Sequence, residues 1–420
     1  MKKVFTNKNF SLLFFGSLVS SIGTTIYNFA ISWYILDLTE SPIQAGTYMA
    51  TGGIVTLLLT PFCGVFADRF DKVKIVYITD FIRGLAIVIA GVVIFQDVSV
   101  STTILVLYLC TIILSINDSL FNPAVSSLQT EIVKPEELQT ANATISLINS
   151  LRSIIGILLG GTLYAILGIK WIFIVNGLSF IFSGLSEMFI KHPYKSKEDK
   201  LTFKSGITDM RAGLIYLLSK KGLIALLFGS LLLNFALLPL FSNGFPFLFN
   251  QLLKVSLIQY SYVQVAFSVG ALLGAIVIGN MASKIKVGKS ATLGIIGMII
   301  VFVSIAVVFN MIIVDSIDFR IFIWITMGLM LSFGIVNMYT NIPLNTAFAN
   351  SIEPEYRGRA FSFVGAMSMA ATPFAVFIGG LTIEYAGLQA LLYSSVVLLI
   401  LIMIYILVNK NIRLYLKSID

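Results

Sequence analysis

Long apolar segments alternate with short polar stretches along the whole chain. Each apolar segment reaches the length of about 20 residues that a helix needs to cross a bilayer. The segments are residues 10–36, 43–67, 73–95, 101–122, 138–166, 168–191, 221–248, 258–282, 289–313, 319–345, 357–384 and 386–408. A helix satisfies its own backbone hydrogen bonds in lipid, so the pattern predicts an all-α membrane protein with twelve transmembrane helices.

Composition supports a membrane location. Of the 420 residues, 57% are hydrophobic and 11% are charged, and the mean hydropathy is +0.95. A soluble domain carries about a quarter charged residues. Residues 1–10 lead directly into a full-length apolar segment, so we expect no cleavable signal peptide. We expect a monomer in the cytoplasmic membrane, with the lipid bilayer as its surroundings.

The formal net charge is +8, and the basic residues are unequally distributed between the two sides of the membrane. If the loops alternate between sides, nearly all Lys and Arg residues fall on the side of the N-terminus. The exceptions are Lys170, Lys254 and Arg320 on the opposite side, and Arg83 and Arg152 inside apolar segments. This is the positive-inside bias of a protein with both termini in the cytoplasm. The basic balance therefore reports topology, and we expect no nucleic-acid partner.

Cysteine and histidine are too sparse to support a metal centre or a nucleophilic enzyme site. Cys63 and Cys110 both fall in apolar segments without a paired spacing, and His192 is the single histidine. No disulfide framework follows from this pattern. We therefore expect no metal, no cofactor and no enzymatic activity.

The stretch from Gly64 to Lys74 is the densest charge cluster in the first 130 residues. It contains Gly64, Asp68, Arg69, Asp71 and Lys72 between two apolar segments. Such charges are not accepted in a bilayer interior, so they predict a tight turn outside it. The alternative is an ordinary charged membrane turn with no special role.

Two ionisable residues lie in the third apolar segment. Asp80 and Arg83 are three residues apart, so they share a helix face and can pair. Arg83 lies about 15 Å into the span at 1.5 Å per residue. At that depth a charge costs several kcal/mol unless it is paired or hydrated. The pair either anchors the preceding loop or takes part in coupling to protons.

Asp118 and Arg152 are the other charged candidates. Asp118 lies in the fourth segment, and a partly buried acid there has the character of a proton carrier. It can equally stay hydrated near the cytoplasmic mouth. Arg152 lies about four turns into the fifth segment without a charge on its own helix face, so it is a functional-site hypothesis, with Asp118 as one candidate partner.

Small residues mark two further features. Ser20, Ser21, Thr24, Thr25, Tyr27 and Asn28 recur along the first segment and either face a water-filled cavity or pack between helices. Gly156, Gly160 and Gly161 in the fifth segment permit close helix contact.

The second half of the chain repeats the first at an offset of 219 residues. The matched positions are Asn122, Pro135, Glu136, Gly160, Gly161 and Gly168 with Asn341, Pro354, Glu355, Gly379, Gly380 and Gly387. The repeat predicts two pseudo-symmetric six-helix bundles, residues 1–191 and 221–420. They are joined by a cytoplasmic linker, 192–220, with an amphipathic helix over 201–221.

The loop read as G-x-x-x-D-R-x-D-K resembles the loop 2–3 signature of the major facilitator superfamily. The glycines of the fifth segment are similar to the antiporter signature of its exporters, although Ile157 stands where that pattern has Pro. Within the superfamily, residues 38–41, Asp80, Arg83, 122–124 and 135–142 are most similar to the macrolide-efflux and enterobactin-exporter type. The resemblance implies the major facilitator fold, and that Asp68 docks near 356–358 as a conformational switch in the outward-open state.

The function that follows is export of small amphipathic, drug-like or siderophore-like molecules by proton antiport and alternating access, with a role in multidrug and antibiotic resistance. We expect an apolar and aromatic cavity suited to hydrophobic or weakly cationic substrates. The proton-coupling candidates are Asp118, Arg83, Arg152 and Asp80. The alternatives are a proton-coupled uptake symporter for a small metabolite and a non-transporting membrane sensor.

Overall fold

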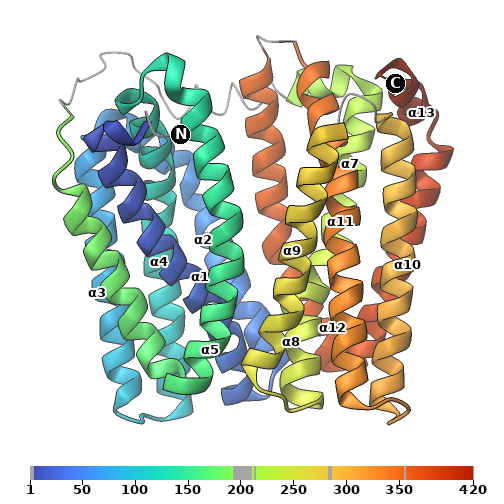
Figure 1. The fold of residues 1–420 in the computed structure, drawn as a ribbon, viewed down its shortest axis with the longest axis horizontal. Helices are drawn as coiled ribbons and strands as arrows, with labels where there is room; N and C mark the ends of the chain where they lie inside the picture. The colour runs from blue at the N-terminus through green and yellow to red at the C-terminus, as the bar shows by residue number, and fades with distance from the viewer. Residues whose placement is uncertain (1–3, 193–210, 212–213, 282–285, 354–355, 420) are drawn as a thin grey trace. The chain divides into compact units, whose positions relative to one another are not determined.

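The computed structural model describes residues 4–192, 211, 214–281, 286–353 and 356–419, and these are helical almost throughout (Figure 1). No strand occurs among them. The elements are η1 Val4–Thr6, α1 Lys8–Thr39, α2 Pro42–Arg69, α3 Lys72–Phe95, α4 Val100–Ile132, η2 Pro135–Glu137, α5 Leu138–Glu187, α7 Lys221–Pro239, η3 Leu240–Gly244, α8 Phe245–Phe247, η4 Leu248–Leu252, α9 Leu257–Met281, α10 Val287–Ile313, α11 Phe319–Ser351, α12 Arg357–Val408 and α13 Lys410–Ile419.

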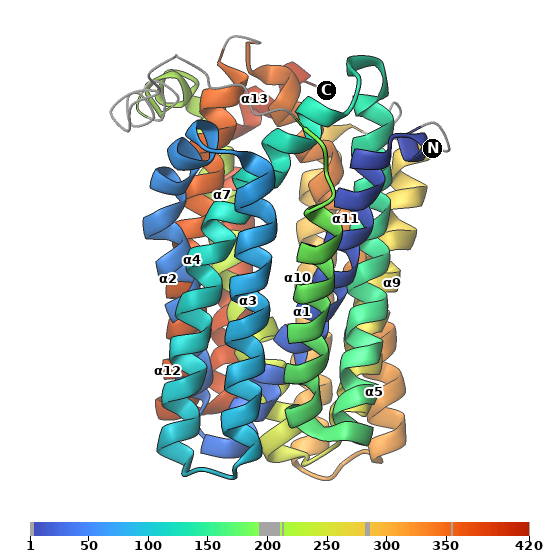
Figure 2. The ribbon, with the colours of Figure 1, turned by 90° about the vertical axis from the view of Figure 1, so that its left-hand side faces the viewer.

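The chain forms two compact units. The first contains Met1–Glu40, Tyr48–Gly206 and Ser256–Ser261, and the second contains Ser41–Thr47, Ile207–Val255 and Tyr262–Asp420. In the first unit, α1 and α3 pack along α5, and α4 packs on α3 (Figure 2). In the second unit, α12 packs on α7 and α10, and α10 packs on α11.

The helix surfaces confirm the prediction of an all-α membrane protein. Among the described residues, nine helices are long and apolar enough to cross a bilayer. Large apolar side chains on these helices are widely exposed, for example Phe182 at 62% and Leu105 at 59%. Exposed apolar area on this scale is stable in lipid, whereas soluble proteins rarely carry it in large contiguous patches.

Two of the helical segments are divided by a glycine. Gly168 in α5 has φ +75° and Gly387 in α12 has φ +82°, and both backbones leave the helical region at these points. With ψ 174° and 169°, both lie in an extended region of positive φ that costs residues with a Cβ atom about 1–3 kcal/mol and that glycine adopts freely. The breaks fall beside the predicted span boundaries. The two glycines are also one matched pair of the 219-residue repeat, so both halves turn at equivalent positions.

Replacing Gly168 with Ala is expected to lower stability by about 1–3 kcal/mol through backbone strain alone. A Cβ atom at Gly168 meets nothing within 4 Å. Gly328, inside α11, is the matched control, because a Cβ atom there also meets open space but the backbone is helical. We expect the thermal midpoint of purified protein to fall for Gly168→Ala and to hold or rise for Gly328→Ala. Equal midpoints would contradict the assigned strain.

The predicted span 221–248 is more irregular than a single helix. It runs as α7, then the π-helical turn η3, the short α8 and a second π-helical turn, η4. Pro239 ends α7 and Pro246 lies in α8. Each proline removes a backbone donor, which favours a local change of helical pitch. The backbone around these two prolines therefore forms π turns.

The predicted amphipathic helix over 201–221 falls largely outside the described residues. Of that range, residue 211 and residues 214–219 are helical.

Candidate functional site

The turn between α2 and α3 is held by capping and by an ion pair. The Oδ1 atom of Asp71 accepts hydrogen bonds from the backbone N–H groups of Val73 and Lys74, so Asp71 is the N-cap of α3. Lys72 is buried and its Nζ atom lies 3.0 Å from Glu131 Oε1 at the end of α4. His192 Nε2 lies 3.1 Å from the other carboxylate oxygen of Glu131. These contacts tie the turn to two other segments of its own unit.

Other residues of this loop are described only in part. Arg69 is exposed and ends α2. The surroundings of Gly64 and Asp68 are not among the described features, and in the proposed docking segment 356–358 only Tyr356 has a described side chain. The docking of Asp68 therefore stays a prediction.

Gly156, Gly160 and Gly161, together with Gly379 and Gly380, the repeat matches of the last two, all lie in close contacts within their units. A Cβ atom at Gly156 would come 2.6 Å from Thr25, and one at Gly160 would come 3.3 Å from the carbonyl oxygen of Ile26, both on α1. Gly161 faces Ser261, Gly379 faces Pro239 and Gly380 faces the backbone of Pro42 at similar distances. At each of these positions a side chain would displace a neighbour.

Asp80, Arg83 and Asp118 form one connected group inside the first unit. The guanidinium of Arg83 pairs with Asp80 on its own helix, and its other terminal nitrogen lies 2.6 Å from Asp118 Oδ1 on α4. The rings of Phe121 and Phe180 lie 4.0 Å and 4.6 Å from the guanidinium carbon, in cation–π geometry. Asp80 and Arg83 are buried, whereas the Asp118 side chain is 43% exposed.

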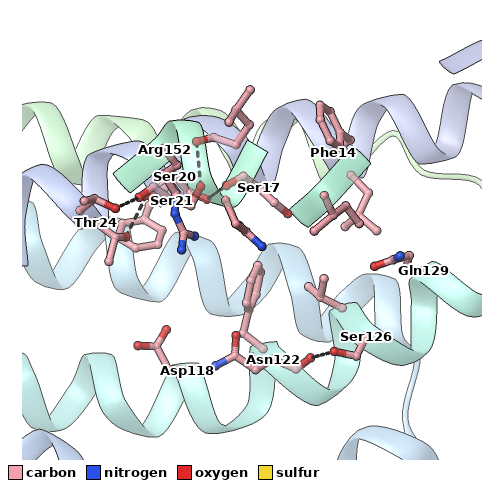
Figure 3. A pocket seen from close by; sticks show the side chains of 18 of the residues that line it. Phe14, Ser17, Ser20, Ser21, Thr24, Asp118, Asn122, Ser126, Gln129 and Arg152 are labelled. Atoms are coloured by element: carbon pink, nitrogen blue, oxygen red, sulfur yellow. Dashed lines mark hydrogen bonds between the residues drawn. The ribbon is translucent and has the colours of Figure 1, made fainter. Parts of the chain in front are cut away.

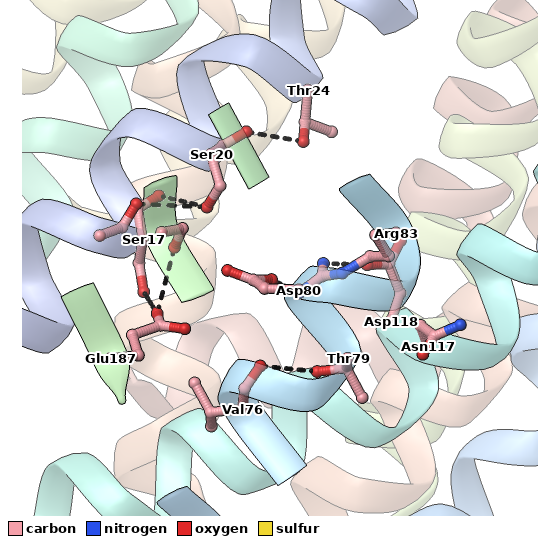
Figure 4. Close-up of polar contacts among 12 residues, drawn as sticks. Ser17, Ser20, Thr24, Val76, Thr79, Asp80, Arg83, Asn117, Asp118 and Glu187 are labelled. Atoms are coloured by element: carbon pink, nitrogen blue, oxygen red, sulfur yellow. Dashed lines mark hydrogen bonds and ion pairs between the residues drawn. The ribbon is translucent and has the colours of Figure 1, made fainter. Parts of the chain in front are cut away.

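Glu187 belongs to the same group and was not a predicted site residue. It is fully buried at the end of α5, and its Oε1 atom accepts hydrogen bonds from Ser17 and Ser183 at 3.4 and 3.3 Å. Its carboxyl group also interacts with that of Asp80, which lies between Glu187 and Arg83 in Figure 4. The Oε2 atom of Glu187 and the Oδ2 atom of Asp80 have no other hydrogen-bond partner among the described residues. An acidic residue within the apolar segment 168–191 was the sequence signal for it.

A polar cavity of about 480 Å³ opens beside this group. Its polar lining comes mainly from α1, α4 and α5, and Figure 3 shows Asp118 and Asn122 on one side with Ser20 and Ser21 on the other. The lining polar residues are Ser17, Ser20, Ser21, Thr24, Thr25, Asn28, Arg83, Asp118, Asn122, Ser126, Gln129, Asn149 and Arg152. The polar face of α1 turns toward this cavity. The apolar part of the lining consists of Phe10, Leu13, Phe14, Leu18, Phe121, Val125, Ile145 and Phe180, so the lining is mixed and the expected apolar and aromatic residues form part of it.

The small polar residues of α1 serve both predicted roles. Ser20, Ser21 and Thr24 line the cavity, and their hydroxyl groups donate to carbonyls one turn back on α1. Tyr27, in contrast, is buried and lies within 3.3 Å of the Tyr48 hydroxyl group on α2. The cavity face and the packing face of α1 are therefore adjacent.

A second cavity, of about 270 Å³, also borders Arg83 and Asp118. It continues past Tyr27, Ile31 and Tyr48, away from the Phe10 end of α1. The Arg83–Asp118 ion pair thus lines both of these cavities. A change in that ion pair would therefore alter the lining of both cavities.

Arg152 does not meet its predicted partner. Its side chain lines the larger cavity, but it forms no ion pair with any described residue, and its buried Nε atom has no hydrogen-bond partner. Asp118 is engaged by Arg83 instead. Among the residues the structure describes, no group of three or more His, Cys, Asp and Glu side chains is suited to hold a metal ion.

A bundle of apolar helices that encloses paired ionisable groups beside a polar cavity defines a class of membrane transport proteins. In such proteins, charged residues within the spans mark the path of the substrate or of the coupling ion.

The chain belongs to the Major Facilitator Superfamily, whose family model matches residues 13–351. It is 27% identical to the MFS-type transporter YkuC of Bacillus subtilis (strain 168), over 94% of this chain and 87% of that protein. It is 24% identical to macrolide efflux protein A of Streptococcus pyogenes, over 97% of this chain and 98% of that protein. These matches confirm the family predicted from the sequence.

Solved structures confirm the fold. A bacterial homologue of the iron transporter ferroportin, in an inward-facing state, has a TM-score of 0.77 at 16% identity, covering 95% of this chain and 98% of that one. The nucleoside transporter NupG has a TM-score of 0.72 at 16% identity, covering 96% and 100%. Membership of the Major Facilitator Superfamily makes the protein an integral membrane transporter, which agrees with the expectation that it is not an enzyme.

Proposed function

We propose that this protein exports small amphipathic molecules across the cytoplasmic membrane by proton antiport and alternating access. The direction rests on the relatives named as macrolide efflux proteins, which match nearly the whole chain. The coupling rests on one observation, the excess of carboxyl groups over cations around Arg83. In this proposal the protein works as a monomer with both termini in the cytoplasm, and the bundles 1–191 and 221–420 alternate around the linker 192–220.

The charge balance of the group supports proton uptake. Asp80, Asp118 and Glu187 surround one guanidinium, that of Arg83, so full ionisation would leave two uncompensated negative charges. Uncompensated charge inside a membrane protein costs several kcal/mol. Protonation of these carboxyl groups removes that cost, and release of the protons to the opposite side of the membrane restores the uncompensated charge.

Glu187 and Asp118 differ in their surroundings, and we assign them different roles in this proposal. Glu187 is fully buried and contacts hydroxyl groups and another carboxyl group, so a resident proton on Glu187 suits its surroundings. That proton would let Glu187 donate to the free oxygen of Asp80 while accepting from Ser17 and Ser183. Asp118 faces the cavity, where it can exchange protons with water, so we assign the coupled proton to Asp118.

The proposal is tested by accumulation of a fluorescent dye and of a macrolide in efflux-deficient cells that express this chain. Proton-driven export lowers the accumulation, and a protonophore restores it. Empty-vector cells are the control for leakage. Higher accumulation that the protonophore abolishes would replace export with uptake symport, and a protonophore-insensitive fall would remove the proton from the mechanism.

A further inference from the structure

Arg152 is a cation without a counter-charge on the wall of a polar cavity. Its side chain is half-buried, its Nε atom is shielded from solvent, and it forms no hydrogen bond or ion pair with the described residues. The other cation of the cavity, Arg83, is neutralised by Asp80 and Asp118. The lining described here thus carries one uncompensated positive charge, at Arg152.

An arginine in this position needs a partner. A buried or half-buried charge in a membrane protein is costly when unpaired, and it is usually paired, hydrated or functional. Arginine offers a planar fork of donors that fits carboxylate and phosphate oxygens in a bidentate manner. Asp118 is already bound 2.6 Å from Arg83, so the chain itself supplies no carboxylate to Arg152 among the described residues.

The rest of the cavity suits the remainder of a ligand. The hydroxyl groups of Ser21, Thr24 and Thr25 donate to carbonyls of their own helix, which leaves their oxygen lone pairs free to accept. Phe10, Leu13 and Phe14 form an apolar wall toward the start of α1. A cavity of about 480 Å³ is within the usual range for small-molecule sites.

We infer that Arg152 binds an anionic oxygen group, a carboxylate or a phosphate, on a small amphipathic molecule whose apolar part packs against Phe10, Leu13 and Phe14. The inference rests on the proposed function only for the role of that molecule as the transported substrate. It reverses the expectation of hydrophobic or weakly cationic substrates, because Arg152 attracts an anionic group and repels a cationic one.

The test uses two probes that differ in one group, dansylglycine, which carries a carboxylate, and dansylglycinamide, which carries a neutral amide. Binding to the purified full chain in neutral detergent is followed by dansyl fluorescence. Loss of one charged hydrogen-bonding partner changes affinity on the order of tenfold to a hundredfold. We expect the wild type to prefer the carboxylate by that factor.

Variants locate the preference. Arg152→Gln and Arg152→Met are expected to bind both probes equally, and Arg152→Lys is expected to keep part of the preference because it keeps the charge. Lys170→Gln is the matched control, since it removes one positive charge from the same unit at a position paired with Asp97 outside the cavity. It is expected to keep the full preference. The ratio of the two affinities is read within each variant, so a lower yield of folded protein does not change it.

Three outcomes would overturn the inference. The first is equal affinity of the wild type for both probes, and the second is a full carboxylate preference in the Arg152 variants. The third is displacement of dansylglycine, but not of dansylglycinamide, by short-chain phosphatidylglycerol, which would assign the site to a lipid headgroup. These results are separable from a failure of the proposed function. A lost protonophore response with an intact carboxylate preference would refute proton-driven export and leave the anion site in place.

Discussion

Asp118→Asn is expected to abolish energised efflux while sparing downhill exchange of the same substrate. The substitution keeps the size of the side chain and one oxygen that can accept from Arg83, so the 2.6 Å contact has a neutral replacement. It removes the carboxyl group that faces both cavities. Without it, substrate can still cross along its own gradient, but no proton movement is linked to it. The measurement is transport in proteoliposomes with and without an imposed pH gradient.

Glu187→Gln is the matched control for that experiment. It removes one carboxyl group from the same cluster, but glutamine reproduces a protonated glutamate, which accepts through one terminal atom and donates through the other. We expect Glu187→Gln to keep energised efflux. Loss of uphill transport in Glu187→Gln together with full uphill transport in Asp118→Asn would move the coupled proton from Asp118 to Glu187.

Arg83→Met is expected to cause the largest loss of stability of any single substitution in the first unit. Arg83 is buried and is the shared partner of Asp80 and Asp118, and its guanidinium also lies against Phe121 and Phe180. Removing one partner of a buried ion pair costs about 3–5 kcal/mol, because the other charge remains buried. We expect little folded protein by size-exclusion chromatography of detergent extracts.

A second substitution separates this explanation from simple loss of packing. In Arg83→Met with Asp80→Asn, the fully buried carboxylate is neutral, so most of the lost stability should return. Asp80→Asn alone is the reference for the double-mutant comparison. If the double variant is as unstable as Arg83→Met, the cost comes from lost contacts of the arginine with the two phenylalanine rings rather than from the stranded charge.

Much of the fold could be predicted because its signals are local. An apolar run of about 20 residues predicts a spanning helix without knowledge of its neighbours. The predicted boundaries after residues 166 and 384 lie beside the breaks at Gly168 and Gly387, which adopt a backbone conformation that is essentially restricted to glycine. The irregular structure of the seventh span was harder to predict. A proline indicates that the helix is disturbed, but it does not indicate whether the backbone forms a kink or π turns such as η3 and η4.

The sequence was enough to predict most residues of the candidate site. It was not enough to predict which of them form ion pairs across helices. Asp80 with Arg83 could be paired from helical spacing, since three residues separate them. Asp118 was a candidate partner of Arg152 because charges inside a membrane protein are usually paired. In the structure Asp118 forms its ion pair with Arg83 instead. Which of two arginines an acid reaches depends on helix packing and rotation, and neither is encoded locally.

By itself, the sequence determined that this protein is a helical membrane protein of the major facilitator type, with charges inside its first bundle. Hydropathy, the positions of glycines and the charged loop are each properties of a short stretch of sequence, so they can be recognised without a structure. Only the packing of separate helices brings Glu187 to Asp80, gives Arg83 two acids and leaves Arg152 without an acidic partner among the described residues. These facts depend on contacts between separate helices, whose packing sets which buried charges meet.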